Sequence, residues 1–216
     1  GSTSNVADNA ATRGATVAFN HNEALWLILN GEAKWDEWKM YVMNKHLYNG
    51  GIWIKTLKQI ALERRVTVES LKEGFLGMDF RACPCTNNPH AKRTFNDAAT
   101  NYERPAKADR SKYMFMPAAG YFGRPTLASQ QNLRLMLFCG DQGFYWTSNA
   151  GVTDNKGAMA FTFQRNDVSP FVDGDHSRYD ATLDTPSFTI SLVNFDKYTG
   201  APYLVDFSQT GKFRLR

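Results

Sequence analysis

The chain has 216 residues, of which 43% are hydrophobic, 21% charged and 13% aromatic. These values are typical of a globular domain that buries a core without disulfide bonds or metals, and they exclude disordered and collagen-like chains. The net charge of +4 is small and the basic residues are scattered. A nucleic-acid-binding protein is therefore disfavoured, because such proteins gather their cations on one surface.

No apolar stretch approaches the length of about 20 residues that a membrane-spanning helix requires, and the longest covers only residues 24–29. Gly1 and Ser2 are typical of a cloning remnant, so we expect that a natural leader or a lipid-anchored N-terminus was trimmed. Residues 1–16 are small, polar and aperiodic, which predicts a disordered linker. Residues 17–216 are predicted to form a single domain.

The first third of this domain, residues 17–100, has the apolar spacing of helices. Trp35, Trp38 and Val42 stand at positions i, i+3 and i+7, which places them on one helical face. A turn-forming Asn-Gly pair precedes them, so we predict that a helix begins after Glu32.

Two further helical segments are predicted before the chain changes character. The apolar residues of segment 52–65 repeat the helical spacing, and Thr67 can cap a short helix that stops near Gly74 or Gly77. Residues 83–112 are rich in Pro, Asn, Lys and Arg and have no periodicity, which predicts a long loop.

The second half, residues 110–216, consists of short apolar or alternating runs between turn residues. In segments 158–164 and 187–194 the period is two, which is typical of strands. We predict a curved antiparallel sheet with hairpin turns at 154–157 and 209–211. Because helices precede strands, the fold class is predicted to be α+β. The predicted strands are 113–116, 134–138, 143–148, 158–164, 187–194, 202–207 and 212–215.

Several residues of these strands are expected to serve the architecture. Gly120 and Gly143 allow positive φ or close packing at strand ends, and Pro117 is suited to the end of an edge strand. Tyr145 and Trp146 are neighbours on one strand, so they point to opposite faces. We predict that one of them belongs to the core and that the other is available at the surface.

Two segments of the second half carry a family resemblance. Segment 113–121 (YMFMPAAGY) is an apolar strand that ends in Pro-Ala-Ala-Gly-Tyr, and segment 143–148 (GFYWTS) is followed by the alternating strand 158–163. In order and spacing they resemble C-type-lectin-like domains of Bacteroidetes surface and fimbria-associated lipoproteins. The resemblance covers residues 112–216, about half of the chain. Thr147 departs from the family pattern, which usually has serine there, and the insert from 122 to 142 is unusually long.

The resemblance implies a C-type-lectin-like fold, in which N-terminal helices flank a small curved antiparallel sheet with long loops. It also implies a secreted or lipid-anchored adhesion protein at the cell surface, on the outer membrane or outside the cell. We therefore predict a binding domain that recognises a glycan or a protein partner through loops 122–142 and 165–181, with no transmembrane segment and no nucleic-acid partner. The alternative is a structural assembly subunit of a surface appendage.

The predicted ligand contacts are aromatic and acidic residues in or beside these loops. The aspartates lie in a Gly-containing loop of the composition that calcium uses, so calcium is the one cofactor considered. No EF-hand spacing is present, however, and the alternative is a solvated loop with Asx turns. The predicted contact residues are Trp146, Phe171, Asp173, Asp175 and Tyr179.

An enzyme is the less favoured class. A hydrolase or oxidoreductase would use Cys83 and Cys85, or His176 beside the two aspartates of the predicted site. The Cys-x-Cys pair lacks the spacing of a zinc knuckle or of the usual redox motif. No Gly-x-Ser-x-Gly, His-Glu-x-x-His or phosphate-loop motif is present. We therefore predict no catalytic residues.

Overall fold

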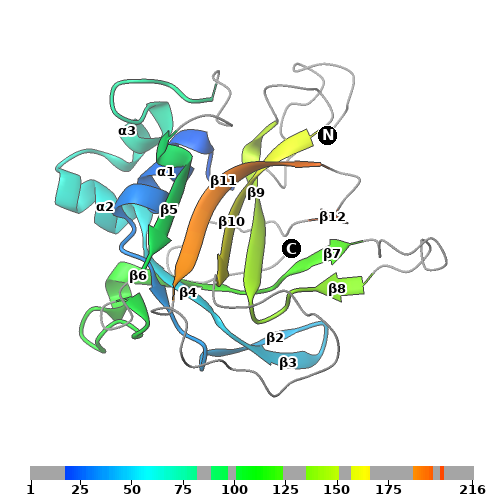
Figure 1. Ribbon diagram of the computed structural model, residues 1–216. Helices are drawn as coiled ribbons and strands as arrows, with labels where there is room; N and C mark the ends of the chain where they lie inside the picture. The colour runs from blue at the N-terminus through cyan, green and yellow to red at the C-terminus, as the bar shows by residue number, and fades with distance from the viewer. Residues whose placement is uncertain are drawn as a thin grey trace.

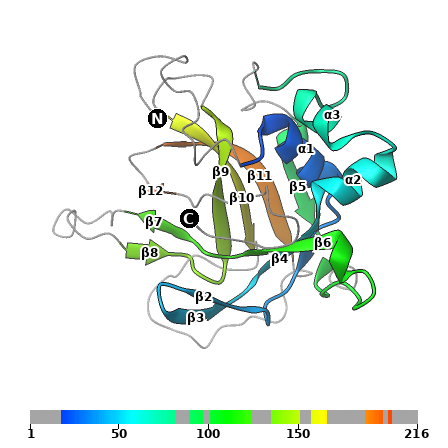
Figure 2. The same cartoon turned by 180° about the vertical axis from the view of Figure 1, so that it is seen from behind.

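The computed structural model describes residues 18–81, 89–96, 101–123, 135–150, 157–165, 187–196 and 200–201. Within these ranges the chain has a mixed α+β fold of short helices and small antiparallel sheets (Figure 1), so the predicted fold class is confirmed. The helices gather on one side of the largest sheet, as the view from behind also shows (Figure 2).

The described helices are α1 (His21–Asn30), α2 (Leu57–Arg64) and α3 (Val68–Glu73), with 3-10 turns η2 (Pro89–Ala91) and η3 (Arg110–Lys112). The first strands are β1 (Lys34–Trp35), β2 (Met40–Met43), β3 (His46–Asn49), β4 (Gly51–Lys55), β5 (Lys92–Phe95) and β6 (Tyr113–Pro117). The later strands are β7 (Tyr121–Gly123), β8 (Leu135–Leu137), β9 (Gln142–Ala150), β10 (Gly157–Arg165), β11 (Phe188–Asp196) and β12 (Gly200–Ala201).

Four groups of hydrogen-bonded strands order these elements. The largest sheet has the order β5-β11-β10-β9, and two three-stranded sheets have the orders β1-β4-β6 and β12-β7-β8. Strands β2 and β3 form a separate two-stranded ribbon. Every strand pair is antiparallel, which confirms the predicted sheet type in the second half.

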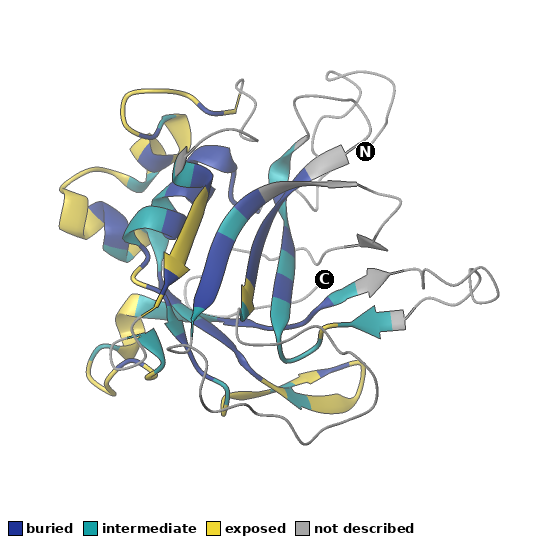
Figure 3. Cartoon of the chain, in the orientation of Figure 1, coloured by how far each residue is buried: buried dark blue, intermediate teal, exposed yellow. Residues whose placement is uncertain are grey.

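The main core lies between the helices and one face of the four-stranded sheet, where buried segments of α1, β9, β10 and β11 meet (Figure 3). Phe19, just before α1, packs its ring edge-on against Phe161 of β10 at 5.2 Å. Tyr145 of β9 and Phe163 of β10 stack at 6.0 Å, and neither is solvent-exposed. The alternation predicted for 158–164 is therefore confirmed, since Met159, Phe161 and Phe163 belong to this core whereas the residues between them lie on the opposite face.

The prediction of a helix after Glu32 is wrong. Residues 34–49 instead form β1 and the β2–β3 ribbon, with Asn44 and Lys45 at its turn at φ values of 51° and 67°. Two consecutive residues with positive φ make the tight turn that joins antiparallel strands, and asparagine tolerates this conformation well. Trp35 is fully buried whereas Trp38 is 75% exposed, so they do not share the face that helical spacing assigned to them.

The other predictions for residues 17–100 are confirmed in part. Helix α3 is capped by Thr67, whose hydroxyl accepts the Ser70 backbone N–H, and it ends at Gly74 as predicted. The helix predicted for 52–65 is wrong in its first residues. Strand β4 pairs with β6 there, and α2 begins only after the Thr56 cap. The loop prediction for 83–112 is wrong at residues 92–95, which form strand β5. Pairing with β11 holds this polar segment in a strand conformation.

Most strands predicted in the second half are confirmed: β6, β8, β9, β10 and β11 match the predicted segments within a few residues. Segments 202–207, 209–211 and 212–215 lie outside the described residues, as do residues 154–156 of the other predicted turn.

The two segments that carry the family resemblance contact each other. The Tyr145 hydroxyl donates a hydrogen bond to the Pro117 carbonyl, and the Gly120 N–H donates to the Gln142 carbonyl at 2.7 Å. Gly120 has a φ of 63°, and a Cβ there would lie 1.9 Å from the Leu137 carbonyl oxygen. Glycine is therefore required where β6 passes into β7, as predicted. The prediction for Pro117 is also confirmed, because it ends the edge strand β6.

Substitution of Gly120 by alanine is expected to destabilise the fold far more than the same change at Gly77. Both glycines have positive φ, but nothing lies within 4 Å of a Cβ built at Gly77. G77A is expected to cost about 1 kcal/mol of conformational strain, whereas G120A adds a backbone clash and is expected to cost at least about 3 kcal/mol. Urea unfolding followed by tryptophan fluorescence measures both. Equal losses would contradict the close contact at Gly120.

Candidate functional site

The four-stranded sheet has a second face, which points away from α1 and differs in composition from the core face. We call it the outer face. In β9 the alternation sends Tyr145 into the core and Trp146, which is half-buried, to the outer face, as the sequence predicted. The outer face comprises Thr94, Phe144, Trp146, Ala160, Thr162, Gln164, Thr189 and Ser191.

Hydroxyl groups pair across the strands of the outer face. The Thr162 Oγ1 and Ser191 Oγ atoms are 3.0 Å apart, and the Thr94 and Thr189 Oγ1 atoms are 2.9 Å apart. A hydroxyl donates one hydrogen bond and accepts two, so each pair keeps acceptor capacity beyond its internal bond. The sheet therefore has an apolar inner face and an outer face with paired hydroxyls, of which Thr162 and Thr189 are buried, Ser191 is half-buried and Thr94 is exposed.

Aromatic side chains line one edge of the outer face. Tyr121 of β7 packs edge-on against Phe144 of β9 at 4.7 Å and stacks with Phe138 at 5.8 Å. Burial raises the pKa of the Tyr121 phenol. Trp146 stands two residues beyond Phe144 on the same strand. Aromatic rings beside hydroxyl groups are suited to ligands that carry both apolar faces and hydroxyls.

Of the five predicted contact residues, only Trp146 falls within the described part of the chain. Phe171, Asp173, Asp175 and Tyr179 lie outside it. The same holds for the cysteine pair and for the histidine of the enzymatic alternative. Of the two predicted recognition loops, 122–142 contains β8 and connects β7 to β9, whereas residues 124–134 of it and residues 166–181 of the second loop lie outside the described part of the chain.

Sequence reasoning missed several residues of this face. The alternation that placed Trp146 also places Phe144 on its side, so Phe144 could have been found. The hydroxyl pair of Thr162 and Ser191 depends on the register of β10 against β11, and the approach of Tyr121 depends on how β7 packs. No pattern in the sequence predicts either contact.

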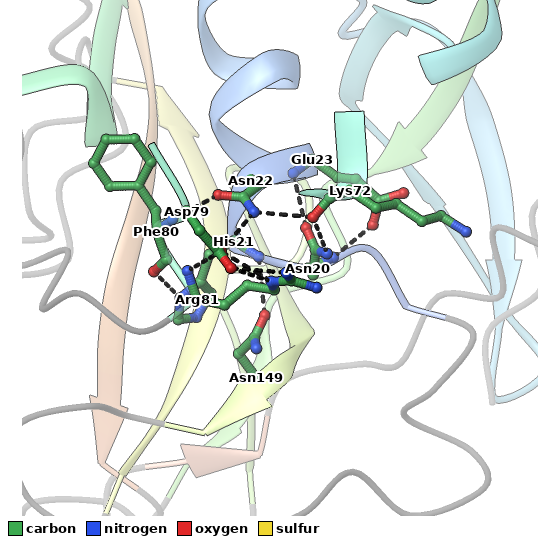
Figure 4. Close-up of polar contacts among 9 residues, drawn as sticks. All are labelled: Asn20, His21, Asn22, Glu23, Lys72, Asp79, Phe80, Arg81 and Asn149. Carbon is green, nitrogen blue, oxygen red and sulfur yellow. Dashed lines mark hydrogen bonds and ion pairs between the residues drawn. The ribbon is translucent and has the colours of Figure 1, made fainter. Parts of the chain in front are cut away.

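A second group of polar side chains gathers at the N-terminus of α1 (Figure 4). Asn20 and Glu23 form a capping box: the Asn20 Oδ1 accepts from the Glu23 N–H at 3.0 Å, and Glu23 Oε2 accepts from the Asn20 N–H at 2.8 Å. Asn22 donates to the Lys72 carbonyl and to Asp79 Oδ1, each at 2.9 Å. These bonds tie α1 to the end of α3 and to the segment after it. The Asn-x-x-Glu spacing is the sequence signal for this cap.

His21 lies at the centre of this group and has no solvent exposure. Its backbone N–H donates to Asn149 Oδ1 of β9 at 3.0 Å, and its Nδ1 lies 3.3 Å from the Phe80 carbonyl. A carbonyl only accepts, so the hydrogen of the neutral ring sits on Nδ1. Burial lowers the pKa of His21 to about 4 and raises that of Glu23.

The group at the α1 N-terminus is suited to architecture rather than to chemistry. Its buried side chains are engaged with backbone groups or with one another, and they link three elements. Nowhere in the described ranges do three or more His, Cys, Asp or Glu side chains gather in a way that could hold a metal. The outer face is therefore the candidate functional site.

Comparison of the chain with protein-family models, with curated proteins and with solved structures found no match. The functional proposals therefore rest on the geometry of the described residues and on the sequence. Among the helices of the described ranges, none is both long and apolar enough to cross a membrane.

The buried His21 is expected to make the protein less stable in mild acid. The unfolded chain binds this proton below its ordinary pKa of 6.5, but the folded protein binds it only below about 4. Protonation therefore favours the unfolded chain between these values, and about 3 kcal/mol of the free energy of unfolding is lost as pH falls through that interval.

The variant H21N tests this dependence in urea unfolding measured at a series of pH values. Asparagine keeps a donor near the Nδ1 position but does not titrate, so the fall in stability below pH 6.5 should be smaller than in wild type. The raised pKa of Glu23 has the opposite effect, because its protonation at low pH favours the folded protein. Glu23 is present in both proteins, so its contribution cancels in the comparison. Parallel pH profiles would show that His21 does not carry the effect.

Proposed function

We propose that the protein is a binding domain of the cell surface, attached to the outer membrane or released outside the cell, and that it recognises a glycan or a protein partner. The observation that carries the proposal is the outer face, where paired hydroxyls lie beside Phe144 and Trp146. Sugars present apolar ring faces and hydroxyl groups together, so this composition favours a glycan over a purely apolar ligand.

The proposed division of labour separates scaffold from recognition. The inner face of the sheet is fully occupied by the core, so substitutions there affect stability. Loop 122–142 enters strand β9 and loop 165–181 follows strand β10, both of which belong to the sheet of the outer face, and in this proposal the loops supply recognition. In this proposal Phe171, Asp173, Asp175 and Tyr179 add contacts to those of the outer face.

A C-type-lectin-like fold is part of the proposal, together with membership of the Bacteroidetes fimbria-associated lipoproteins. Its support is the sequence resemblance and the contact between the segments that carry it. Gly120 and Gly143 form an isolated β-bridge, and Tyr121 contacts Phe144. The residues that define the resemblance thus meet at the edge of the proposed binding face.

Replacement of Trp146 by alanine is expected to weaken glycan binding. The wild-type protein is first screened on an array of immobilised glycans, and the strongest ligand is titrated by calorimetry. W146A removes the largest aromatic ring of the outer face and is expected to bind the glycan at least about tenfold more weakly. W38A is the matched control, because Trp38 is 75% exposed on another element and its loss should leave affinity unchanged.

Two outcomes would contradict the glycan proposal. If no glycan on the array retains the protein, the alternative of a structural assembly subunit gains support. If W146A and W38A lower the affinity equally, binding does not depend on the outer face.

Calcium is tested separately, because the predicted aspartates lie outside the described residues. If the loop of Asp173 and Asp175 binds calcium, added calcium should raise the unfolding temperature and a chelator should reverse the shift, since a ligand of the folded state stabilises it by mass action. D173N/D175N should abolish the shift, whereas D109N should not, because Asp109 pairs with Lys112 elsewhere. An unchanged melting curve with calcium would rule out the calcium site.

A further inference from the structure

The β2–β3 ribbon lies at the periphery of the molecule (Figure 1), and much of it is exposed (Figure 3). Met40, Val42 and Leu47 are 62%, 67% and 64% exposed, and Trp38, just before β2, is 75% exposed. Val42 lies directly opposite Leu47, and Met40 precedes Val42 on the same side of the strand. We call the exposed side chains of Met40, Val42 and Leu47, together with that of Trp38 in the turn before β2, the ribbon face.

The ribbon face cannot turn inward, because the other side of the ribbon is attached to the body. Tyr41 stacks with Tyr48 at 5.8 Å, and its hydroxyl donates to the Ala118 carbonyl at 2.6 Å. Met43, on the same side as Tyr41, is buried. Successive side chains of a strand alternate, so the burial of this side commits the ribbon face to the outside.

The base of the ribbon is held by a buried carboxylate. Asp36, whose side chain is 2% exposed, accepts from the Trp53 indole at 2.9 Å and pairs with the Arg104 Nε at 3.0 Å. Its other oxygen accepts from the Trp38 backbone N–H at 3.1 Å. The backbone of Trp38 is thereby held at the start of the ribbon, so little backbone entropy is lost when it contacts a partner.

The charged residues of segment 38–50 have one sign. Lys39 and Lys45 are exposed, and no acidic residue occurs between positions 38 and 50. The two acidic residues that precede Trp38 are both paired: Asp36 with Arg104 at 3.0 Å and Glu37 with Arg165 at 3.4 Å. An apolar surface flanked by lysines complements a surface that is apolar inside and negatively charged outside.

We propose that the ribbon face docks on a phospholipid membrane that contains anionic lipids. Trp38 lies at the level of the headgroups, where indole rings are favoured. Met40, Val42 and Leu47 enter the boundary of the acyl region, and Lys39 and Lys45 contact lipid phosphates. This attachment is separate from ligand recognition by the outer face.

A second copy of the chain fits the ribbon face less well. In a two-fold symmetric contact each patch faces its own copy, which would bring the lysines of both chains together. Four side chains also supply only a few hundred Å² of apolar surface, less than the about 800 Å² per partner of a stable protein interface. A membrane needs no more than a few apolar side chains supported by cations.

Vesicle co-sedimentation with the full chain tests the proposal. The protein is expected to sediment with vesicles of phosphatidylcholine and phosphatidylglycerol, to bind phosphatidylcholine alone much more weakly, and to dissociate as salt is raised. Its tryptophan fluorescence should shift to the blue on binding, and W38F should lose most of this shift, because Trp38 is the most exposed tryptophan of the described residues.

Two double variants separate the apolar and the charged contributions. V42T/L47T removes apolar surface, places β-branched threonines that suit a strand at both positions, and is expected to bind anionic vesicles about tenfold more weakly. K39Q/K45Q should lower affinity about fivefold for each lysine removed and reduce the dependence on salt. L62Q and K58Q are the matched controls, because Leu62 and Lys58 are exposed on α2. Circular dichroism and thermal unfolding verify that each variant is folded.

Three results would overturn the proposal. The first is no sedimentation of wild type with anionic vesicles at low salt. The second is equal binding by wild type and both double variants. The third is a wild-type dimer in analytical ultracentrifugation that V42T/L47T converts to a monomer, which would assign the ribbon face to a second copy of the chain.

Discussion

The buried hydrogen bonds at the N-terminus of α1 set the position of the helix against the sheet. Asn20 and Glu23 cap the helix, Asn22 joins it to α3 and to the segment after α3, and His21 joins it to Asn149 of β9. Buried polar groups cost several kcal/mol when they lose their partners, so these elements must be placed together or not at all. The aromatic core behind the sheet depends on this placement.

The arrangement of the sheet follows from that attachment. Because α1 covers one face, every second side chain of β9, β10 and β11 is committed to the core, and the others form a polar face with aromatic residues at its edge. Tyr145 connects β9 of this sheet to β6, since its ring is buried in the core and its hydroxyl donates to the carbonyl of Pro117, where β6 ends. The same stretch of β9 thus stabilises the interior and presents Trp146 and Phe144 for recognition.

The two proposed contact surfaces have different physical characters. The outer face combines hydroxyl groups with rings and matches a ligand that has both polar and apolar groups. The ribbon face of Trp38, Met40, Val42 and Leu47 has exposed apolar side chains beside two lysines and matches an anionic bilayer. A domain with both surfaces could hold a ligand while resting on a membrane.

The sequence by itself determined the α+β class, the strands of period two, the cap of α3 and the opposite faces of Tyr145 and Trp146, because these depend on local backbone geometry. It failed at residues 34–49, where apolar residues at helical spacing belong to β1 and to the ribbon. Only the tertiary structure decided that segment, and it also decided the contact of Tyr121 with Phe144 and the burial of His21. Strand pairing and side-chain packing depend on residues far apart in the chain, and a local pattern does not contain them.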